Sequence, residues 1–150
     1  MQTQYSIRRA LASDLPVVYI GELDSIRQSE PQIEVPWKDA MRVHLAQWMA
    51  ALDRMFIIES GSEAAGYCFW VAQGRAAVLT SIYVLPERRR NGLGRRLLDY
   101  CITDARAQGF DKLILGVRPD SFARLLCEKV GFVHTHDVGH YRHYAYSMTE

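Results

Sequence analysis

The sequence predicts an α/β fold with a mixed sheet and helices on both of its faces. Three observations support this prediction. The 150 residues are 49% hydrophobic and 23% charged, which suits a globular domain that buries about two-thirds of its unfolded surface. Apolar residues recur with the period of a strand in some segments and with that of a helix in others. These segments follow the order β-α-α-β-β-β-α-β-α-β-β, with no repeat or long linker, so we expect a single domain over 1–150.

The first third of the chain is predicted to form one strand and two helices. Residues 5–9 alternate as in a strand. Ser13 is placed to cap a helix with Asp14 and Pro16 in its first turn, where both are favourable. A polar link over 29–36 ends this helix. The stripe of a second helix comprises Met41, Leu45, Trp48, Met49 and Leu52.

The middle of the chain is predicted to form three consecutive strands and a long helix. The strands cover 55–59, 65–72 and 76–84, with hairpin turns at Gly61-Ser62 and Gln73-Gly74. A helix then begins near Gly92 and ends near Gly109, since glycine commonly follows the last turn of a helix. Its apolar face comprises Leu93, Leu97, Leu98, Cys101, Ile102 and Ala105.

The last third of the chain is predicted to add a strand, a helix and a strand pair. Asp120 or Ser121 is placed to cap the helix, and Gly131 to end it. A turn at Gly139 joins the final two strands. The three strands cover 112–117, 132–135 and 141–148.

Composition excludes several classes of protein. Three scattered cysteines (Cys68, Cys101 and Cys127) are too few for a disulfide framework and indicate reduced thiols in a cytoplasmic protein. No apolar run approaches the roughly 20 residues that span a bilayer, and no signal peptide opens the chain, so we expect no membrane association. A net charge of +1 argues against nucleic-acid binding. The arginine cluster of 88–96 also lacks the interleaved aromatics of a nucleic-acid-binding surface.

This arginine cluster carries the clearest chemical signal. It lies between a strand that ends near Val84 and the start of a helix, where backbone N–H groups have no partner within the helix. Gly92 and Gly94 have no Cβ, so an anion can approach these amides. Arg89 and Arg90 add forked donors suited to phosphate oxygens. The pattern is typical of a pyrophosphate site, and the alternative is a solvated charge run at the start of a core helix.

Other phosphate-binding motifs fit less well. A P-loop requires Lys-Ser or Lys-Thr after its last glycine, and neither follows Gly94. A dinucleotide-binding fingerprint requires a third glycine where Leu97 stands. The segment Arg89-Arg-Asn-Gly92-Leu-Gly94, which follows a strand ending in Val-Leu-Pro, instead matches the R-x-x-G-x-G signature of acyl-CoA-binding proteins. A second segment, from Asp120 to Phe132, resembles the pattern N-x-x-A-x-x-L-Y-E-K-x-G-F, with Asp120 and Cys127 in place of its asparagine and tyrosine.

With these two matches, residues 78–132 resemble the GNAT superfamily of acyl-CoA-dependent N-acyltransferases. The resemblance implies a GNAT-like fold, one N-acetyltransferase domain over 1–150, acetyl-CoA as co-substrate and, at the level of the family, a homodimer. It also implies that strands 76–84 and 112–117 splay apart around the pantetheine arm. The implied cofactor-binding residues are Ile82, Tyr83, Val84, Arg89, Arg90, Asn91, Gly92, Leu93, Gly94, Arg95, Ser121 and Arg124.

The implied reaction is direct attack of a primary amine, in a small molecule or a peptide, on the acetyl thioester. A backbone N–H, assigned to Ile82, stabilises the tetrahedral oxyanion. Two alternatives stay open. In the first, the acceptor is the N-terminus or a lysine of a protein. In the second, the chain is a catalytically weak acyl-CoA sensor.

The sequence departs from the family at the proton donor. The usual tyrosine is replaced by Cys127. A thiol is also protonated at neutral pH, so Cys127 is a candidate general acid, although its side chain is shorter. The alternative is that Cys127 only packs in the core.

The general base and the acceptor site are less defined. The strand before the loop offers Thr80 and Ser81 where family members often carry a carboxylate. An aromatic with carboxylates suits an amine, so Glu30, Glu34 and Trp37 are the expected acceptor-binding residues. His134 and His136 are expected to share a face of a strand, but no partner ligands surround them, and we predict no metal site. Candidate bases, left unassigned, are Glu22, Glu30, Glu34, His134, His136, His140 and His143.

Overall fold

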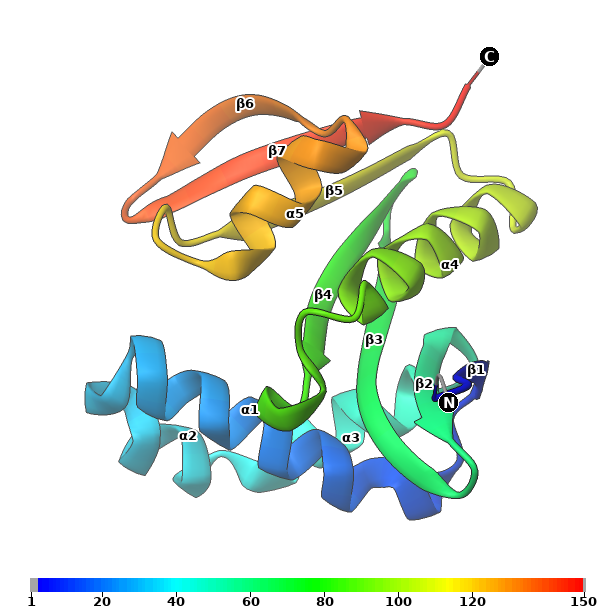
Figure 1. The fold of residues 1–150 in the computed structure, drawn as a ribbon. Helices are drawn as coiled ribbons and strands as arrows, with labels where there is room; N and C mark the ends of the chain where they lie inside the picture. The colour runs from blue at the N-terminus through cyan, green and yellow to red at the C-terminus, as the bar shows by residue number, and fades with distance from the viewer. Residues whose placement is uncertain (1–2, 150) are drawn as a thin grey trace.

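A seven-stranded sheet with the strand order β1-β2-β3-β4-β5-β7-β6 forms the centre of the computed structural model, which describes residues 3–149 (Figure 1). All neighbouring strands run antiparallel except β4 and β5. The strands are β1 (Ser6–Arg9), β2 (Met55–Ser60), β3 (Glu63–Gln73), β4 (Ala76–Val84), β5 (Lys112–Val117), β6 (Val133–Val138) and β7 (Tyr141–Ser147). The α-helices are α1 (Leu15–Ser29), α2 (Glu34–Asp39), α3 (Met41–Ala50), α4 (Leu93–Ala107) and α5 (Phe122–Val130). The predicted α/β fold with a mixed sheet is confirmed.

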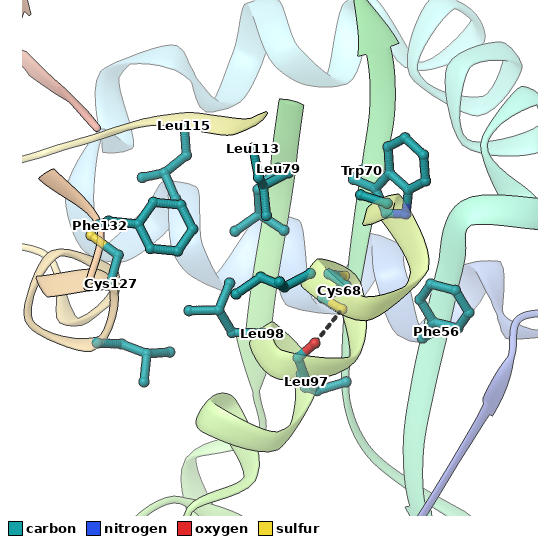
Figure 2. Packing of buried hydrophobic residues seen from close by; sticks show 14 of the residues in the cluster. Phe56, Cys68, Trp70, Leu79, Leu97, Leu98, Leu113, Leu115, Cys127 and Phe132 are labelled. Carbon is teal, nitrogen blue, oxygen red and sulfur yellow. Dashed lines mark hydrogen bonds between the residues drawn. The ribbon is translucent and has the colours of Figure 1, made fainter. Parts of the chain in front are cut away.

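Helices cover both faces of the sheet, as expected. Figure 1 shows α1, α2 and α3 gathered on one side, and α4 and α5 on the other. Alternate residues of one strand face the two sides: Tyr67 packs with α1 and α3, whereas its neighbour Cys68 packs with α4. Figure 2 shows the α4 side, where the Cys68 thiol lies 3.4 Å from the carbonyl oxygen of Leu97. Every residue of the predicted α4 stripe is buried.

The first helical segment differs from its prediction. Ser13 does not cap α1. A 3-10 turn (Ala12–Asp14) precedes the helix, and Asp14 accepts a hydrogen bond from the Leu11 N–H at 2.7 Å. Asp14 also receives two 2.8 Å hydrogen bonds from Arg8, which hold β1 to the start of α1.

An additional helix, α2, lies in the segment expected to be a link. A 3-10 turn (Pro31–Ile33) leads directly into it. Pro36 is tolerated because it lies in the first turn, where its missing N–H has no partner to lose. In α3, Trp48 is buried, whereas Leu45 and Met49, expected on the same stripe, are exposed.

The parting of β4 and β5 positions the functional site. The two strands pair only at Ala77–Leu113 and Val78–Ile114 and separate beyond that point. A bulge at Thr80 interrupts the pairing of β4 with β3, since Leu79 and Ser81 face adjacent residues of β3. The splay expected from the resemblance is therefore present. None of the helices within residues 3–149 has the length and apolar character needed to cross a bilayer.

Candidate active site

A cavity of about 480 Å³ fills the space between the separating strands. Its walls come from β4, the end of β5, the second half of α1 and the start of α5. Its lining includes Arg89 of the arginine loop and Gly94 of α4, together with Glu22 of α1, Glu30 just after that helix and Tyr141 of β7. The cavity thus joins the arginine loop on one face of the sheet to the carboxylates on the other.

The arginine loop is shaped by two left-handed residues, Arg90 with φ of 67° and Gly92 with φ of 74°. Gly92 is the N-cap of α4, and within the described chain no side chain accepts from the first N–H groups of the helix. Those N–H groups are therefore open to an anion. Arg89 lies over the end of β4: its Nε donates to the Val84 carbonyl at 2.8 Å, its guanidinium lies 5.5 Å from the centre of the Tyr83 ring, and it reaches Asp24 of α1 at 4.0 Å.

The other loop residues have separate contacts. Asn91 donates from Nδ2 to the Arg88 carbonyl at 3.0 Å and so braces the loop. Arg95 points along the exposed side of α4, where it pairs with Asp99 at 3.3 Å, and Arg90 is exposed. A Cβ on Gly94 would lie 3.3 Å from Leu126, so this glycine also allows α5 to approach α4 closely.

The start of α5 lies on the opposite side of the cavity mouth. Ser121 caps this helix by accepting from the Arg124 N–H at 3.3 Å, and Gly131 ends it with φ of 114°, as predicted. Ser121 lines the cavity. Arg124 does not, because its guanidinium donates to the Pro119 carbonyl at 2.7 Å and pairs with Glu128.

Glu22 places a carboxyl group on the cavity wall. Its Oε2 accepts a hydrogen bond from the Ser81 hydroxyl of β4 at 3.1 Å. Burial raises the pKa of Glu22 to about 7, an effect that hydrogen bonds from Ser81 and Tyr67 partly offset. Of the seven candidate bases, Glu22 and Glu30 alone line this cavity within residues 3–149. A carboxyl that titrates near neutrality can accept a proton from a bound ammonium group.

Cys127 and Tyr141 are two cavity residues with acidic hydrogens, and Tyr83, whose hydroxyl donates to Asp24 at 2.6 Å, is a third. Cys127 is buried beside Phe132 and Leu115 (Figure 2), and its thiol contacts the Arg124 carbonyl at 3.2 Å. Burial raises the pKa of Cys127 to about 11, so the thiol keeps its proton at neutral pH. The Tyr141 hydroxyl donates to Glu30 Oε1 at 2.5 Å and links β7 to the end of α1. The sequence alone gave no signal for this pair, because 111 positions separate the two residues.

Only one of the three expected acceptor-binding residues reaches the cavity. Glu30 lines it, whereas Glu34 faces away and binds Arg27 at 2.8 Å and Lys38 at 3.1 Å. Trp37 stacks on Tyr19, with ring centres 5.6 Å apart, and on His44 at 5.2 Å. Both residues lie in α2, where their contacts with Arg27, Lys38, Tyr19 and His44 hold the side chains outside the cavity.

The C-terminal histidines lie outside this cavity. A bulge at Thr135 separates His134 from His136 in the β6–β7 pairing. His134 packs on Tyr144 and His136 on His143, two consecutive residues that face opposite sides of the sheet. The expectation that His134 and His136 share a face is therefore wrong. In the part of the chain that the structure describes, no group of three potential ligands could hold a metal ion.

Comparison with solved structures gives the same fold. The PaiA N-acetyltransferase of Thermoplasma acidophilum, in complex with coenzyme A, has a TM-score of 0.80 at 20% identity, covering 96% of this chain and 99% of that one. N-acetylglutamate synthase of Neisseria gonorrhoeae, complexed with coenzyme A and N-acetyl-glutamate, has a TM-score of 0.75 at 16% identity, covering 100% of this chain and 36% of that one.

Sequence comparison identifies the family. N-acetyltransferase family 8 member 3 of Rattus norvegicus is 28% identical over 121 residues, which cover 67% of this chain and 51% of the rat protein. This chain thus spans about half the length of that relative. The model of the acetyltransferase (GNAT) family matches residues 21–132. These residues include the arginine loop, the parting strands and Glu22, so the chain belongs to the acetyltransferase (GNAT) family.

Proposed function

We propose that this chain transfers the acetyl group of acetyl-CoA to a primary amine of a small molecule or peptide. One observation carries the proposal: a single cavity connects the open N-terminus of α4 with a carboxyl group whose pKa lies near 7. The first feature suits a diphosphate, and the second suits removal of a proton from an ammonium group.

The acetyl-CoA would extend from α4 into the gap between β4 and β5. Its diphosphate fits the N–H groups of residues 92–95, with Arg89 and Arg90 supplying positive charge. Its pantetheine arm fits beside Ile82, Tyr83 and Val84, which have no strand partner on the β5 side. The coenzyme A bound to relatives of the same fold supports this choice of donor.

In the proposed reaction, Glu22 accepts the proton of the ammonium group, and the neutral amine attacks the thioester carbonyl carbon. The oxyanion that forms lies at the parting point of the strands, where we assign the stabilising donor to the backbone N–H of Ile82. Removal of one such donor typically slows an enzyme by about 100- to 1000-fold. The C–S bond then breaks, coenzyme A leaves as a thiolate, and the nitrogen loses its second proton to that thiolate or to solvent to give the neutral amide.

Cys127 is a weak proton donor for that thiolate. A reference thiol has a pKa of about 8.5, below the value of about 11 that burial gives Cys127. Proton transfer from Cys127 is therefore uphill, and its contribution to turnover is a modest one. This observation also favours a second candidate function, an acyl-CoA sensor that binds the cofactor but transfers its acyl group slowly.

Two measurements test the proposal. Acetyl-CoA should raise the melting temperature of the protein, and a thiol-release assay should then find turnover with members of a panel of amines and peptides. Turnover with folded proteins or N-terminal peptides alone would assign the acceptor to proteins. Stabilisation by acetyl-CoA without thiol release across the panel would favour the sensor, and an unchanged melting temperature would refute acetyl-CoA binding.

A further inference from the structure

A second cavity, of about 440 Å³, adjoins the first at the end of the sheet. It lies between the loop that follows β5 and the turn that joins β6 to β7. Arg118, Asp120 and Tyr141 line both cavities, so the two share a wall. The remaining residues of the second cavity are Pro119, Asp137, Gly139, His140 and Arg142.

Two arginines that line the second cavity have unused hydrogen-bond donors. The Nε atoms of Arg118 and Arg142 are shielded from solvent and donate no hydrogen bond to any group among residues 3–149. Arg142 also forms no ion pair with any described carboxylate, and its guanidinium lies over the Tyr144 ring at 5.8 Å. Buried donors are normally satisfied, and both arginines line the second cavity, so this arrangement favours a ligand that brings acceptor oxygens to their guanidinium groups.

The two carboxylates that line the second cavity form no ion pair with Arg142. Asp137 accepts from the His134 ring at 2.7 Å. Asp120 lies 3.5 Å from Arg118 Nε, and its side chain is 76% exposed. Of the two arginines that line this cavity, Arg142 is thus the one that forms no ion pair within 4.0 Å with a described carboxylate, and its planar fork suits a carboxylate.

The second cavity lies where an acceptor bound in the first cavity could extend into it. The end of the first cavity near the arginine loop suits the cofactor, and the end near Glu22 and Glu30 is left for the amine. An acceptor that places its amine at Glu22 and extends past Tyr141 enters the second cavity. Resting on the proposed function, we infer that the acceptor is an amine that also carries a carboxylate, which Arg142 and Arg118 bind in this second cavity.

The test compares acceptors that differ only in this charge. Amino acids, ω-amino acids of increasing chain length and dipeptides are assayed with acetyl-CoA as free acids and as C-terminal amides. We expect the preferred acid to exceed its amide about tenfold or more in kcat/KM, through KM, because charge-assisted hydrogen bonds are lost in the amide. Calorimetric titration of the coenzyme A-loaded protein with the same compounds measures binding without turnover.

Variants of Arg142 test whether the second cavity causes the preference for acids over amides. In Arg142→Met the acid and the amide should differ by less than about twofold, while Arg142→Lys keeps part of the preference. Arg75→Met, on the exposed β3–β4 turn, is the matched control and should behave as the wild type. Unchanged affinity for acetyl-CoA in Arg142→Met shows that the variant is folded.

Three results would overturn the inference. The wild type could treat acids and amides equally, or Arg142→Met could keep the wild-type preference. Arg142→Met could also weaken acetyl-CoA but not 3′-dephospho-acetyl-CoA, which would assign the cavity to the 3′-phosphate of the cofactor. Binding of the acids in preference to the amides, without acetylation of any of them, would support this inference while refuting the proposed function.

Discussion

Replacement of Glu22 by glutamine tests the proposed role of this carboxyl group as the general base. Glutamine resembles the protonated carboxyl in size and can still accept hydrogen bonds from Ser81 and Tyr67. It cannot accept a proton from a bound ammonium. General bases contribute roughly 100- to 10,000-fold to rate, so we expect kcat/KM to fall at least about 100-fold while the Kd of acetyl-CoA is unchanged.

The pH dependence gives the sharper readout. Since the pKa of Glu22 lies near 7, the wild-type plot of kcat/KM against pH should bend near pH 7, with activity rising as the carboxyl group loses its proton. The bend should disappear in Glu22→Gln. A thiol-release assay with an amine acceptor of pKa near 10 keeps the titration of the acceptor away from this bend.

Glu22→Gln should lower activity but should raise the free energy of unfolding above neutral pH. The Glu22 pKa is about 7 in the folded protein, against 4.5 ordinarily, so the folded state holds its proton more tightly than the unfolded state. Wild-type stability should therefore fall by about 3 kcal/mol as pH rises from about 4.5 to 7. Glu22→Gln lacks this loss, so at pH 8 it should unfold at higher denaturant concentration than the wild type.

Either of two results would refute this reasoning. A bend near pH 7 that persists in Glu22→Gln would assign the titration to another group. A wild-type free energy of unfolding that is flat between pH 4.5 and 7 would show that burial does not perturb this carboxyl group.

Three further predictions concern the cofactor, the proton donor and the frame of the fold. Arg89→Met should weaken acetyl-CoA about tenfold by calorimetry and reduce the salt dependence of binding, whereas Arg75→Met should not; equal affinities would exclude Arg89 from the site. Cys127→Ala should lower turnover several-fold and leave acetyl-CoA affinity nearly unchanged, and unaltered turnover would assign Cys127 to packing. Asp14→Asn should destabilise the protein by about 2 kcal/mol. Because Arg8 holds the Asp14 pKa below its usual range, the wild-type advantage should shrink as pH falls through that lowered pKa, and an advantage that is constant in acid would contradict this.

The sequence predicts best the elements whose signals are local. The buried stripe of α4 follows from the spacing of its apolar residues, and the limits of α5 follow from a serine cap and a terminal glycine. The arginine loop is likewise a contiguous motif. Each of these signals lies within a few turns of chain, where propensity and capping decide the outcome.

The catalytic side of the cavity could not be predicted in the same way, because its contacts join distant parts of the chain. Glu22 was one of seven candidates until its contact with Ser81, 59 positions later, distinguished it. The bond between Glu30 and Tyr141 depends on β7 inserting between β5 and β6. Helix α2 begins within the polar segment that was expected to be a link, and its residues Glu34 and Trp37 do not line the cavity.

A crystal structure of the protein with acetyl-CoA tests the central claim most directly. The diphosphate should lie within hydrogen-bonding distance of the backbone N–H groups at the start of α4, and the pantetheine arm should lie between β4 and β5 with the thioester near Glu22. Density for the cofactor at any other place, or an arm that does not enter the gap between these strands, would contradict the account.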